Sequence, residues 1–163
     1  MNVGIIGSGG REHALCLKIK DSNLVKNIYC FPGNAGTSLI AKNIEIDIDN
    51  FSEIRKKVLE KNITLLIVGP EKPLVNGIVD FFKNTNIKIF GPNKTASQLE
   101  GSKIFTKKLC KKYNIPTSKF EIFDNKDEAI KYLDKSQYPI VVKADGLASG
   151  KGVYICKSND EAK

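Results

Sequence analysis

Apolar residues follow two different spacings along the first 91 residues of the chain. Short runs rich in Val, Ile and Leu, typical of strands, are separated by stretches in which apolar residues recur every three or four positions, as in amphipathic helices. Strands that alternate with helices in this way predict βαβ units, an α/β fold and an open, mostly parallel, Rossmann-like sheet. The predicted strands are residues 2–6, 27–31, 44–48, 64–68 and 88–90, and the predicted helices are residues 11–20, 52–61 and 75–83.

The pattern changes after residue 92. Two short helices are predicted on either side of Gly101, and Ser158 with Glu161 has the spacing of a helix cap close to the end of the sequence. A helix that begins with so little chain left predicts a truncated piece of a longer protein. The predicted helices in this part are residues 95–100 and 102–113, with another after Asn125, and the predicted strands are residues 119–123, 139–143 and 153–156.

Composition indicates a water-soluble protein. Of the 163 residues, 41% are hydrophobic and 27% are charged, and no apolar run approaches the length of a membrane span. The first apolar stretch runs directly into a glycine loop, unlike a signal peptide, so we expect a cytoplasmic protein without a membrane partner. The four cysteines are scattered along the sequence, which predicts reduced, mostly buried thiols rather than a zinc site or a redox pair.

The formal net charge of +8 comes almost entirely from lysine. Only Arg11 and Arg55 are arginines, although nucleic-acid sites favour the bidentate guanidinium group. We therefore interpret the charge as a solvated lysine-rich surface, with nucleic-acid binding as the less favoured alternative.

A glycine-rich loop, GSGG at residues 7–10, follows the first predicted strand and precedes a helix that opens with Arg11. Backbone amides at such a helix start favour an anionic ligand. A dinucleotide fingerprint would need a further glycine where this sequence has Glu12, and the second strand lacks the acidic residue that holds a ribose. NAD binding and a purely structural turn are the alternatives to an anion site.

Two more loops, PGNAGT at residues 32–37 and GPEKPL at residues 69–74, follow other predicted strands. In the first loop, Asn34 and Thr37 offer uncharged groups that suit sugar hydroxyls or phosphate. In the second, two prolines hold Glu71, whose carboxylate suits an amine or a ribose hydroxyl. Each loop alone is typical of a turn, but three loops at the carboxyl ends of strands in one sheet predict a binding site.

The loop ADGLASGKG, residues 144–152, joins two predicted strands and is longer than the about two to five residues of most hairpin loops. Its small residues leave backbone amides free for phosphate oxygens, and Lys143 and Lys151 offset the charge of a polyphosphate. It is not a Walker P-loop, because Lys151 is followed by Gly152 and a strand. We interpret it as a mobile phosphate-binding lid, with a structural glycine hairpin as the alternative.

Two single residues have competing interpretations. Lys103 stands at the start of a predicted helix, where an ammonium group suits a nucleotide, but Lys103, Lys107 and Lys111 also recur as on a solvated face. His13, the only histidine, shares a helix face with Leu17, which favours a packed histidine over a catalytic one. No cluster in the sequence has the spacing of metal ligands.

Six segments together resemble those of glycinamide ribonucleotide synthetases, a family of ATP-grasp ligases. In order, they are GSGGREHA, PGNAGT, IVGPEKPL, IFGPN, QLEGSKIFTK and VVKADGLASGKGV. The resemblance implies a pre-ATP-grasp substrate-binding domain over residues 1–100 and the beginning of an ATP-grasp domain over residues 101–163.

The resemblance also implies the chemistry of the whole protein. Glycine and 5-phosphoribosylamine would be joined with ATP and Mg²⁺ through a glycyl phosphate, giving glycinamide ribonucleotide, ADP and phosphate for purine biosynthesis, in a protein that is monomeric at full length. The residues implied for ATP are Lys103, Lys143, Gly146, Ala148, Ser149, Gly150, Lys151, Gly152 and Val153. Those implied for the phosphoribosylamine pocket are Gly9, Gly10, Arg11, Glu12, Asn34, Gly36, Thr37, Pro70 and Glu71.

The same resemblance places the Mg²⁺ ligands and the adenine-binding hinge beyond Lys163. We therefore expect that these 163 residues alone bind ATP weakly and do not catalyse ligation. The catalytic residues stay unassigned. A non-catalytic nucleotide- or phosphosugar-binding module and an NAD-dependent oxidoreductase are the alternative functions.

Overall fold

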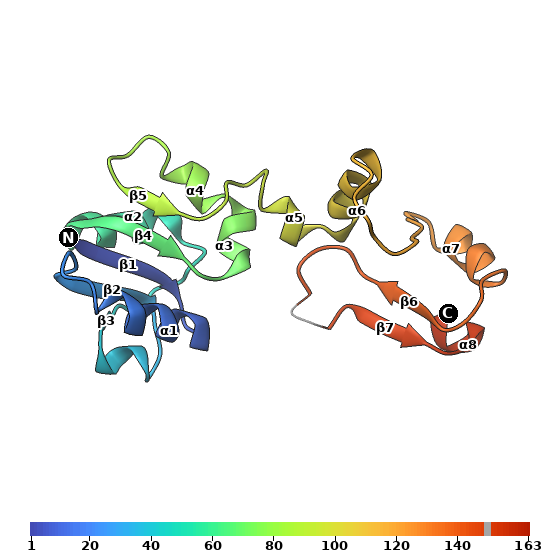
Figure 1. Ribbon diagram of the computed structural model, residues 1–163, viewed down its shortest axis with the longest axis horizontal. Helices are drawn as coiled ribbons and strands as arrows, with labels where there is room; N and C mark the ends of the chain where they lie inside the picture. Colours follow the sequence, from blue (N-terminus) through green and yellow to red (C-terminus); the bar gives the residue numbers. More distant parts are fainter. Residues whose placement is uncertain (149–150) are drawn as a thin grey trace. The chain divides into compact units, whose positions relative to one another are not determined.

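The computed structural model describes residues 1–148 and 151–163 and divides the chain into two compact units, Met1–Ser97 and Gln98–Lys163 (Figure 1). The first unit contains a five-stranded sheet in the order β3-β2-β1-β4-β5, in which every neighbouring pair is parallel. Its strands are β1 (Asn2–Gly7), β2 (Asn27–Pro32), β3 (Lys42–Asn43), β4 (Ile63–Val68) and β5 (Lys88–Phe90). The predicted α/β fold with an open parallel sheet is confirmed.

The strand order reverses at β1, which pairs with both β2 and β4. The loops that follow β1 and β4 therefore leave the sheet side by side at its carboxyl edge. In open α/β sheets, this reversal point is where ligands bind.

Helices cover both faces of the sheet (Figure 1). Successive side chains of a strand point to opposite faces, so Val3 and Ile5 pack with Cys16 of the first helix, whereas Ile6 packs with Ile54 of the second. The helices of this unit are α1 (Gly10–Ile19), α2 (Phe51–Glu60), α3 (Glu71–Asn76) and α4 (Ile78–Phe81), with the 3₁₀-helix η1 (Thr37–Leu39).

Two thiols meet in the core beneath α1. The Sγ atoms of Cys16 and Cys30 are 3.2 Å apart, and both side chains are fully buried. Burial raises the pKa of both thiols, that of Cys30 to about 12, so both are protonated at neutral pH. The prediction of free, buried thiols is confirmed for these two and for Cys156, whereas Cys110 is half-buried.

Asn50 caps α2, as its spacing to Glu53 predicts. Its Oδ1 accepts the N–H of Glu53 at 3.1 Å. Asn50→Ala removes this acceptor and is expected to lower the free energy of unfolding by about 1 kcal/mol in urea titrations followed by circular dichroism. Asn84→Ala, at an exposed turn position, is the control and is expected to change it by less than about 0.5 kcal/mol. Equal effects of the two substitutions would contradict the capping role.

The strand predicted over residues 44–48 is wrong. The pairing of β3 with β2 ends where the Ile44 N–H donates to the Cys30 carbonyl at 2.8 Å, and the residues that follow are irregular. Ile46 is nevertheless buried in the core, with Ile44 and Ile48 packed against it. The apolar alternation therefore reflects the packing of an irregular segment at the sheet edge.

The single helix predicted over residues 75–83 is two helices. Gly77 separates α3 from α4 with a left-handed φ of 95°, a conformation that favours glycine. The first of them begins at Glu71, so Glu71 lies in the first turn of a helix rather than in a loop.

In residues 98–148 and 151–163, the second unit contains an antiparallel pair of strands and four helices. Its elements are α5 (Gln98–Gly101), α6 (Lys103–Lys112), α7 (Lys126–Leu133), β6 (Ile140–Lys143), β7 (Val153–Cys156) and α8 (Asn159–Ala162). The predicted caps at Asn125 and Ser158 are confirmed. Two helices are present as predicted, but α5 begins at Gln98 instead of residue 95 and includes Gly101, so the break between them falls at Ser102. None of the helices in the described part of either unit is long and apolar enough to cross a membrane.

The strand predicted over residues 119–123 is also wrong, because this segment is irregular. Its aromatic side chains contact helices instead of a neighbouring strand. The Lys107 ammonium lies 5.3 Å from the ring centre of Phe120, and the rings of Phe123 and Tyr132 are 5.2 Å apart.

Candidate functional site

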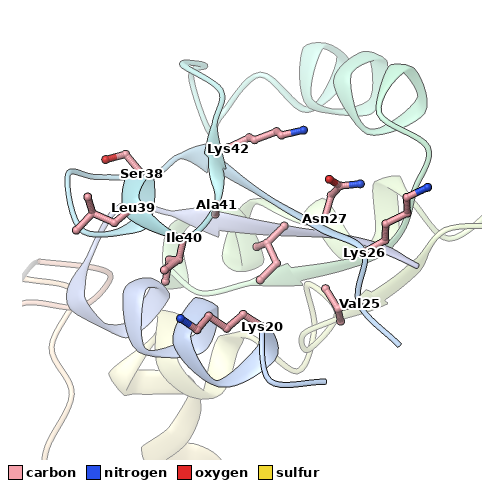
Figure 2. Close-up of a pocket in the computed structure, with 10 residues that line it drawn as sticks. Lys20, Val25, Lys26, Asn27, Ser38, Leu39, Ile40, Ala41 and Lys42 are labelled. Carbon is pink, nitrogen blue, oxygen red and sulfur yellow. The ribbon is translucent and has the colours of Figure 1, made fainter. Parts of the chain in front are cut away.

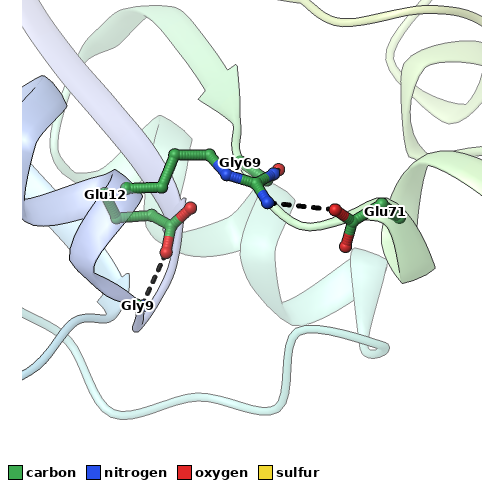
Figure 3. Close-up of polar contacts among 5 residues, drawn as sticks. Gly9, Glu12, Gly69 and Glu71 are labelled. Carbon is green, nitrogen blue, oxygen red and sulfur yellow. Dashed lines mark hydrogen bonds and ion pairs between the residues drawn. The ribbon is translucent and has the colours of Figure 1, made fainter. Parts of the chain in front are cut away.

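The loop after β1 folds around a buried carboxylate. Glu12 is only 4% exposed, and it accepts the N–H of Gly9 at 2.6 Å (Figure 3). A Cβ atom at Gly7 would lie 2.6 Å from Glu12 Cδ, and one at Gly69 would lie 2.8 Å from the same atom. The anion beside this loop is therefore the protein's own Glu12. A dinucleotide pyrophosphate at the same amide would meet a like charge, which argues against NAD binding.

Arg11 connects the loop after β1 to the loop after β4. Its Nη1 donates to the Gly69 carbonyl at 2.5 Å and its Nη2 donates to the Glu71 carboxylate at 3.0 Å (Figure 3). The side chains of Arg11 and Glu71 are 60% and 41% exposed, so solutes can reach both. Hydrogen bonds from its own backbone N–H and from Arg11 lower the pKa of Glu71, which is therefore ionised at neutral pH.

Asn34 connects the loop after β2 to the loop after β1. Its Nδ2 donates to the carbonyl oxygens of Ser8 at 2.9 Å and Gly9 at 3.1 Å, while its Oδ1 accepts the Thr37 N–H at 2.9 Å. Thr37 is fully buried, and its hydroxyl donates to Asn43 Oδ1 at 2.8 Å. Asn43 is not predicted from the sequence, because a single asparagine after a turn carries no motif.

Gly10, Gly36 and Pro70, also predicted to line the substrate pocket, contribute backbone rather than polar side chains to this edge. Gly36 lies against His13, since a Cβ atom at Gly36 would be 2.7 Å from His13 Nδ1. His13 is thus a packing residue, as its helix position favours. A Cβ atom at Gly10 would meet nothing within 4 Å, and Pro70 is the extended residue directly before α3.

The loops after β1, β2 and β4 therefore lie together at one edge of the sheet. Glu12 and Thr37 hold this edge from inside, where a ligand has little access. Arg11, Asn34 and Glu71 are at least partly exposed and offer a cation, an amide and an anion to a solute.

In the second unit, the loop predicted to bind phosphate joins β6 to β7. The Ala144 N–H donates to the Gly152 carbonyl at 2.9 Å and closes the base of the loop. Gly152 is buried, and a Cβ atom there would lie 2.8 Å from Ala148 Cβ. Gly146 has a left-handed φ of 87°, so the loop leaves β6 through a turn that favours glycine.

The other residues predicted to contact ATP are at or near the ends of the two strands. Lys143 ends β6 directly opposite Val153, the first residue of β7. Lys143 and Lys151 are both exposed. Ser149 and Gly150 lie outside the described residues.

Lys103 lies against this loop. It is the first residue of α6, and its partly buried Nζ donates to the Gly146 carbonyl at 2.8 Å. Its amine is therefore directed to the loop, whereas Lys111 on the same helix is exposed.

Asp145 ties the same loop to the start of α6. Its carboxylate accepts the Ser102 hydroxyl at 3.0 Å and the Ile104 N–H at 3.1 Å, while Ser102 Oγ accepts the Phe105 N–H at 3.0 Å. Desolvation opposes ionisation of Asp145, but the hydrogen bonds outweigh it and lower its pKa. Ser102 and Asp145 lie within the quoted segments QLEGSKIFTK and VVKADGLASGKGV, but neither is among the predicted contact residues. A serine before a helix is a recognisable cap, whereas the partners of Asp145 lie more than 40 residues away in the sequence and carry no local signal.

A separate cavity of about 360 Å³ lies in the first unit (Figure 2). It is lined by residues 20, 25–28 and 38–42, none of which is a predicted site residue. Figure 2 shows the amines of Lys20, Lys26 and Lys42 spread around it rather than gathered at one point. Small-molecule sites usually have a few convergent polar groups, so we favour the loop edge as the candidate site.

The described residues do not fit a magnesium site. Within residues 1–148 and 151–163, no group of three His, Cys, Asp or Glu side chains is placed to hold a metal ion. Mg²⁺ needs near-octahedral oxygen ligands, usually including carboxylates.

Comparisons with known proteins cover both units. One family model, phosphoribosylglycinamide synthetase, N domain, matches residues 1–100, and another, phosphoribosylglycinamide synthetase, ATP-grasp (A) domain, matches residues 101–163. The phosphoribosylamine–glycine ligase of Caldanaerobacter subterraneus subsp. tengcongensis is 49% identical over 100% of this chain, which spans 39% of that relative's length.

Solved structures agree with these matches. The crystal structure of the phosphoribosylamine–glycine ligase from Thermotoga maritima is 33% identical, with a TM-score of 0.76 over 99% of this chain and 37% of that chain. N5-carboxyaminoimidazole synthetase from Staphylococcus aureus, at 16% identity and a TM-score of 0.74 over 98% of this chain and 42% of that chain, shares the fold alone. These findings confirm the resemblance seen in the motifs. The chain belongs to the phosphoribosylglycinamide synthetase family.

Proposed function

We propose that the whole protein is an ATP-dependent carbon–nitrogen ligase of purine biosynthesis, acting in the cytoplasm on glycine and 5-phosphoribosylamine. The ATP-grasp family match over residues 101–163, together with the Lys103 amine held at the glycine-rich loop, is the observation that carries this proposal. Relatives 49% and 50% identical to the chain are named for the same reaction, which supports the two substrates. In this proposal, residues 1–100 bind the sugar and residues 101–163 begin the ATP-grasp domain.

The edge of the first unit suits a phosphorylated amino sugar. Such a substrate carries an anionic phosphate at one position and an amine and hydroxyls at others. Arg11 offers a planar guanidinium for the phosphate, and Glu71, ionised at neutral pH, offers an acceptor for the amine or a hydroxyl. The half-buried Asn34 adds an amide that is held by the loop after β1.

The loop of the second unit suits a polyphosphate. Lys103, Lys143 and Lys151 bring three ammonium groups to the two ends of the loop and to the adjoining helix start. Gly146 lacks a side chain and a Cβ atom there would meet nothing within 4 Å, so phosphate oxygens can approach the backbone closely at this residue. This arrangement positions ATP and offsets the charge that develops during phosphoryl transfer.

The proposed reaction has two steps. A carboxylate oxygen of glycine bonds to the γ-phosphorus of ATP, the bond to the bridging oxygen breaks, and ADP leaves. The amine nitrogen of phosphoribosylamine then bonds to the carbonyl carbon of glycyl phosphate, phosphate leaves with the bonding electrons, and the nitrogen loses a proton. The residues of this chain contribute binding, alignment and charge compensation. The whole protein would supply its Mg²⁺ ligands from other residues.

A chimera tests this proposal. Residues 1–163 replace the matching segment of the Caldanaerobacter relative, and ADP release is measured with and without each substrate. We expect ADP release that requires both glycine and phosphoribosylamine. ADP release that does not require glycine, or a folded chimera without activity, would contradict the proposal. Strong ligation by the 163 residues alone would show that the rest of the protein is not needed.

Lys103→Ala in the chimera is expected to lower kcat/KM about tenfold, because one charge-assisted hydrogen bond to phosphate is lost. Steady-state kinetics with varied ATP measure this change. Lys111→Ala, which removes an exposed lysine of the same helix, is the matched control and should leave kcat/KM unchanged. Equal losses in the two variants would exclude a specific role of Lys103.

A further inference from the structure

We infer that Asp145 is a positioning residue that holds the Lys103 amine at the phosphate-binding loop. This inference rests on the proposed function, because Lys103 is the residue proposed to contact the phosphates of ATP. It concerns a side chain that lies within the quoted loop ADGLASGKG but is not among the residues predicted to contact ATP, and that acts on the nucleotide through its effect on Lys103.

The contacts form a closed arrangement between two short segments. The Asp145 carboxylate accepts hydrogen bonds from Ser102 and Ile104, the residues on either side of Lys103. In the opposite direction, Lys103 Nζ donates to the carbonyl of Gly146, the residue after Asp145. Residues 102–104 and residues 145–146 are thus joined by hydrogen bonds in both directions, and we call this arrangement the clasp. Since Lys103 and Gly146 are both fixed by this clasp, the Lys103 side chain loses little further freedom when a ligand arrives.

The charges support a positioning role. Asp145 lies at the start of the ten-residue helix α6, where a carboxylate is favoured by the helix dipole and by unpaired N–H groups. Its lowered pKa shows that these donors stabilise the ionised form. Asp145 therefore accepts hydrogen bonds from the start of α6 without forming an ion pair with Lys103.

Lys103 keeps its positive charge available. Its partner is a neutral carbonyl, and it forms no ion pair with any carboxylate among the described residues. When a phosphate oxygen replaces this carbonyl, the Lys103 amine gains a charged acceptor in place of a neutral one, and this exchange is favourable. An ion pair at the same place would have to be broken first.

Amine acetylation measures the position of Lys103 directly. The 163-residue chain is treated with a limiting amount of an acetylating reagent, and mass spectrometry compares the acetylation rate of Lys103 with that of the exposed Lys111. Asp145→Ala is expected to raise this ratio about fivefold or more, because the amine loses its held partner. Asp145→Asn keeps an acceptor for the Ile104 N–H and should give a smaller rise.

Ser102→Ala provides a second variant that leaves Asp145 in place. It removes one of the donors to the carboxylate, so an intermediate rise in the Lys103 ratio is expected. If Asp145→Ala fails to fold by circular dichroism, Ser102→Ala and Asp145→Asn decide the question. An unchanged ratio in every folded variant overturns the inference.

Nucleotide binding separates this inference from the proposed function. A fluorescent ATP analogue is titrated into the chimera with Asp145→Ala, Lys103→Ala or both. The single variants should weaken binding by similar factors and the double variant no further, because Asp145 acts through Lys103. Additive losses overturn the inference and leave the ATP site in place. A chimera that binds no ATP would overturn the proposed function. If the acetylation rate of Lys103 in that chimera still rises with Asp145→Ala, the positioning role of Asp145 is supported all the same.

Discussion

Replacing Leu66 by alanine is expected to lower the free energy of unfolding by about 3 to 5 kcal/mol. Leu66 is fully buried in β4 and belongs to the core cluster that α2 covers. It lies opposite Gly4 in the neighbouring strand, where a Cβ atom would be 2.8 Å from Leu66 Cδ1. The leucine therefore fills space that Gly4 leaves open, and a rigid sheet cannot collapse around the resulting cavity.

Urea titrations followed through the amide NMR signals of β1 and β4 measure this loss. Leu39→Ala removes the same atoms from a side chain that is 83% exposed, and it is expected to change the free energy of unfolding by less than about 0.5 kcal/mol. A loss below about 1 kcal/mol for Leu66→Ala would show that this part of the core can repack.

The central strands are predictable from sequence because packing and local preference agree there. Both faces of β1 and β4 are covered, so their strands consist of nearly continuous Val, Ile and Leu. At the sheet edge this agreement fails. Ile46 is buried by an irregular segment, and its alternation with polar neighbours looks the same as that of a strand. The break at Gly77 is likewise hidden, because glycine inside a helical pattern does not by itself specify a left-handed conformation.

The candidate site is predictable at the level of loops but not of contacts. Glycine-rich turns after β1, β2 and β4 must meet at one edge once the sheet is parallel. Which side chains close the edge depends on partners far apart in the chain, such as Asn34 with Ser8, or Arg11 with Gly69. A single sequence contains no signal for such pairs.

Two carboxylates illustrate this limit in the same way. The start of α1 and the start of α6 both carry the amides that favour an anion, and the protein supplies its own anion at each place. Glu12 accepts from Gly9, and Asp145 accepts from Ile104. The glycine-rich loop before α1 predicts an anion site, and only the fold shows that the carboxylate of Glu12 lies there.

Gly69→Ala is expected to lower the free energy of unfolding by about 1 to 3 kcal/mol, because the added Cβ enters space that Glu12 occupies. The Cβ atom would lie 2.8 Å from Glu12 Cδ and 3.0 Å from its Cγ. An exposed glutamate would swing away at little cost. Glu12 is only 4% exposed, and moving it breaks its hydrogen bond to the Gly9 N–H. The charged acceptor makes that bond worth about 1.5 to 3 kcal/mol.

The combination with Glu12→Ala tests this mechanism. Glu12→Ala alone is expected to cost about 1.5 to 3 kcal/mol, but it makes room for the new methyl group, so Gly69→Ala should then cost less than about 0.5 kcal/mol more. Urea unfolding of the two single variants and the double variant gives the coupling energy. Gly10→Ala is the control, since a Cβ atom there meets nothing within 4 Å and should not be destabilising. Fully additive costs at residues 12 and 69 would show that Glu12 does not fill the space between the loops after β1 and β4.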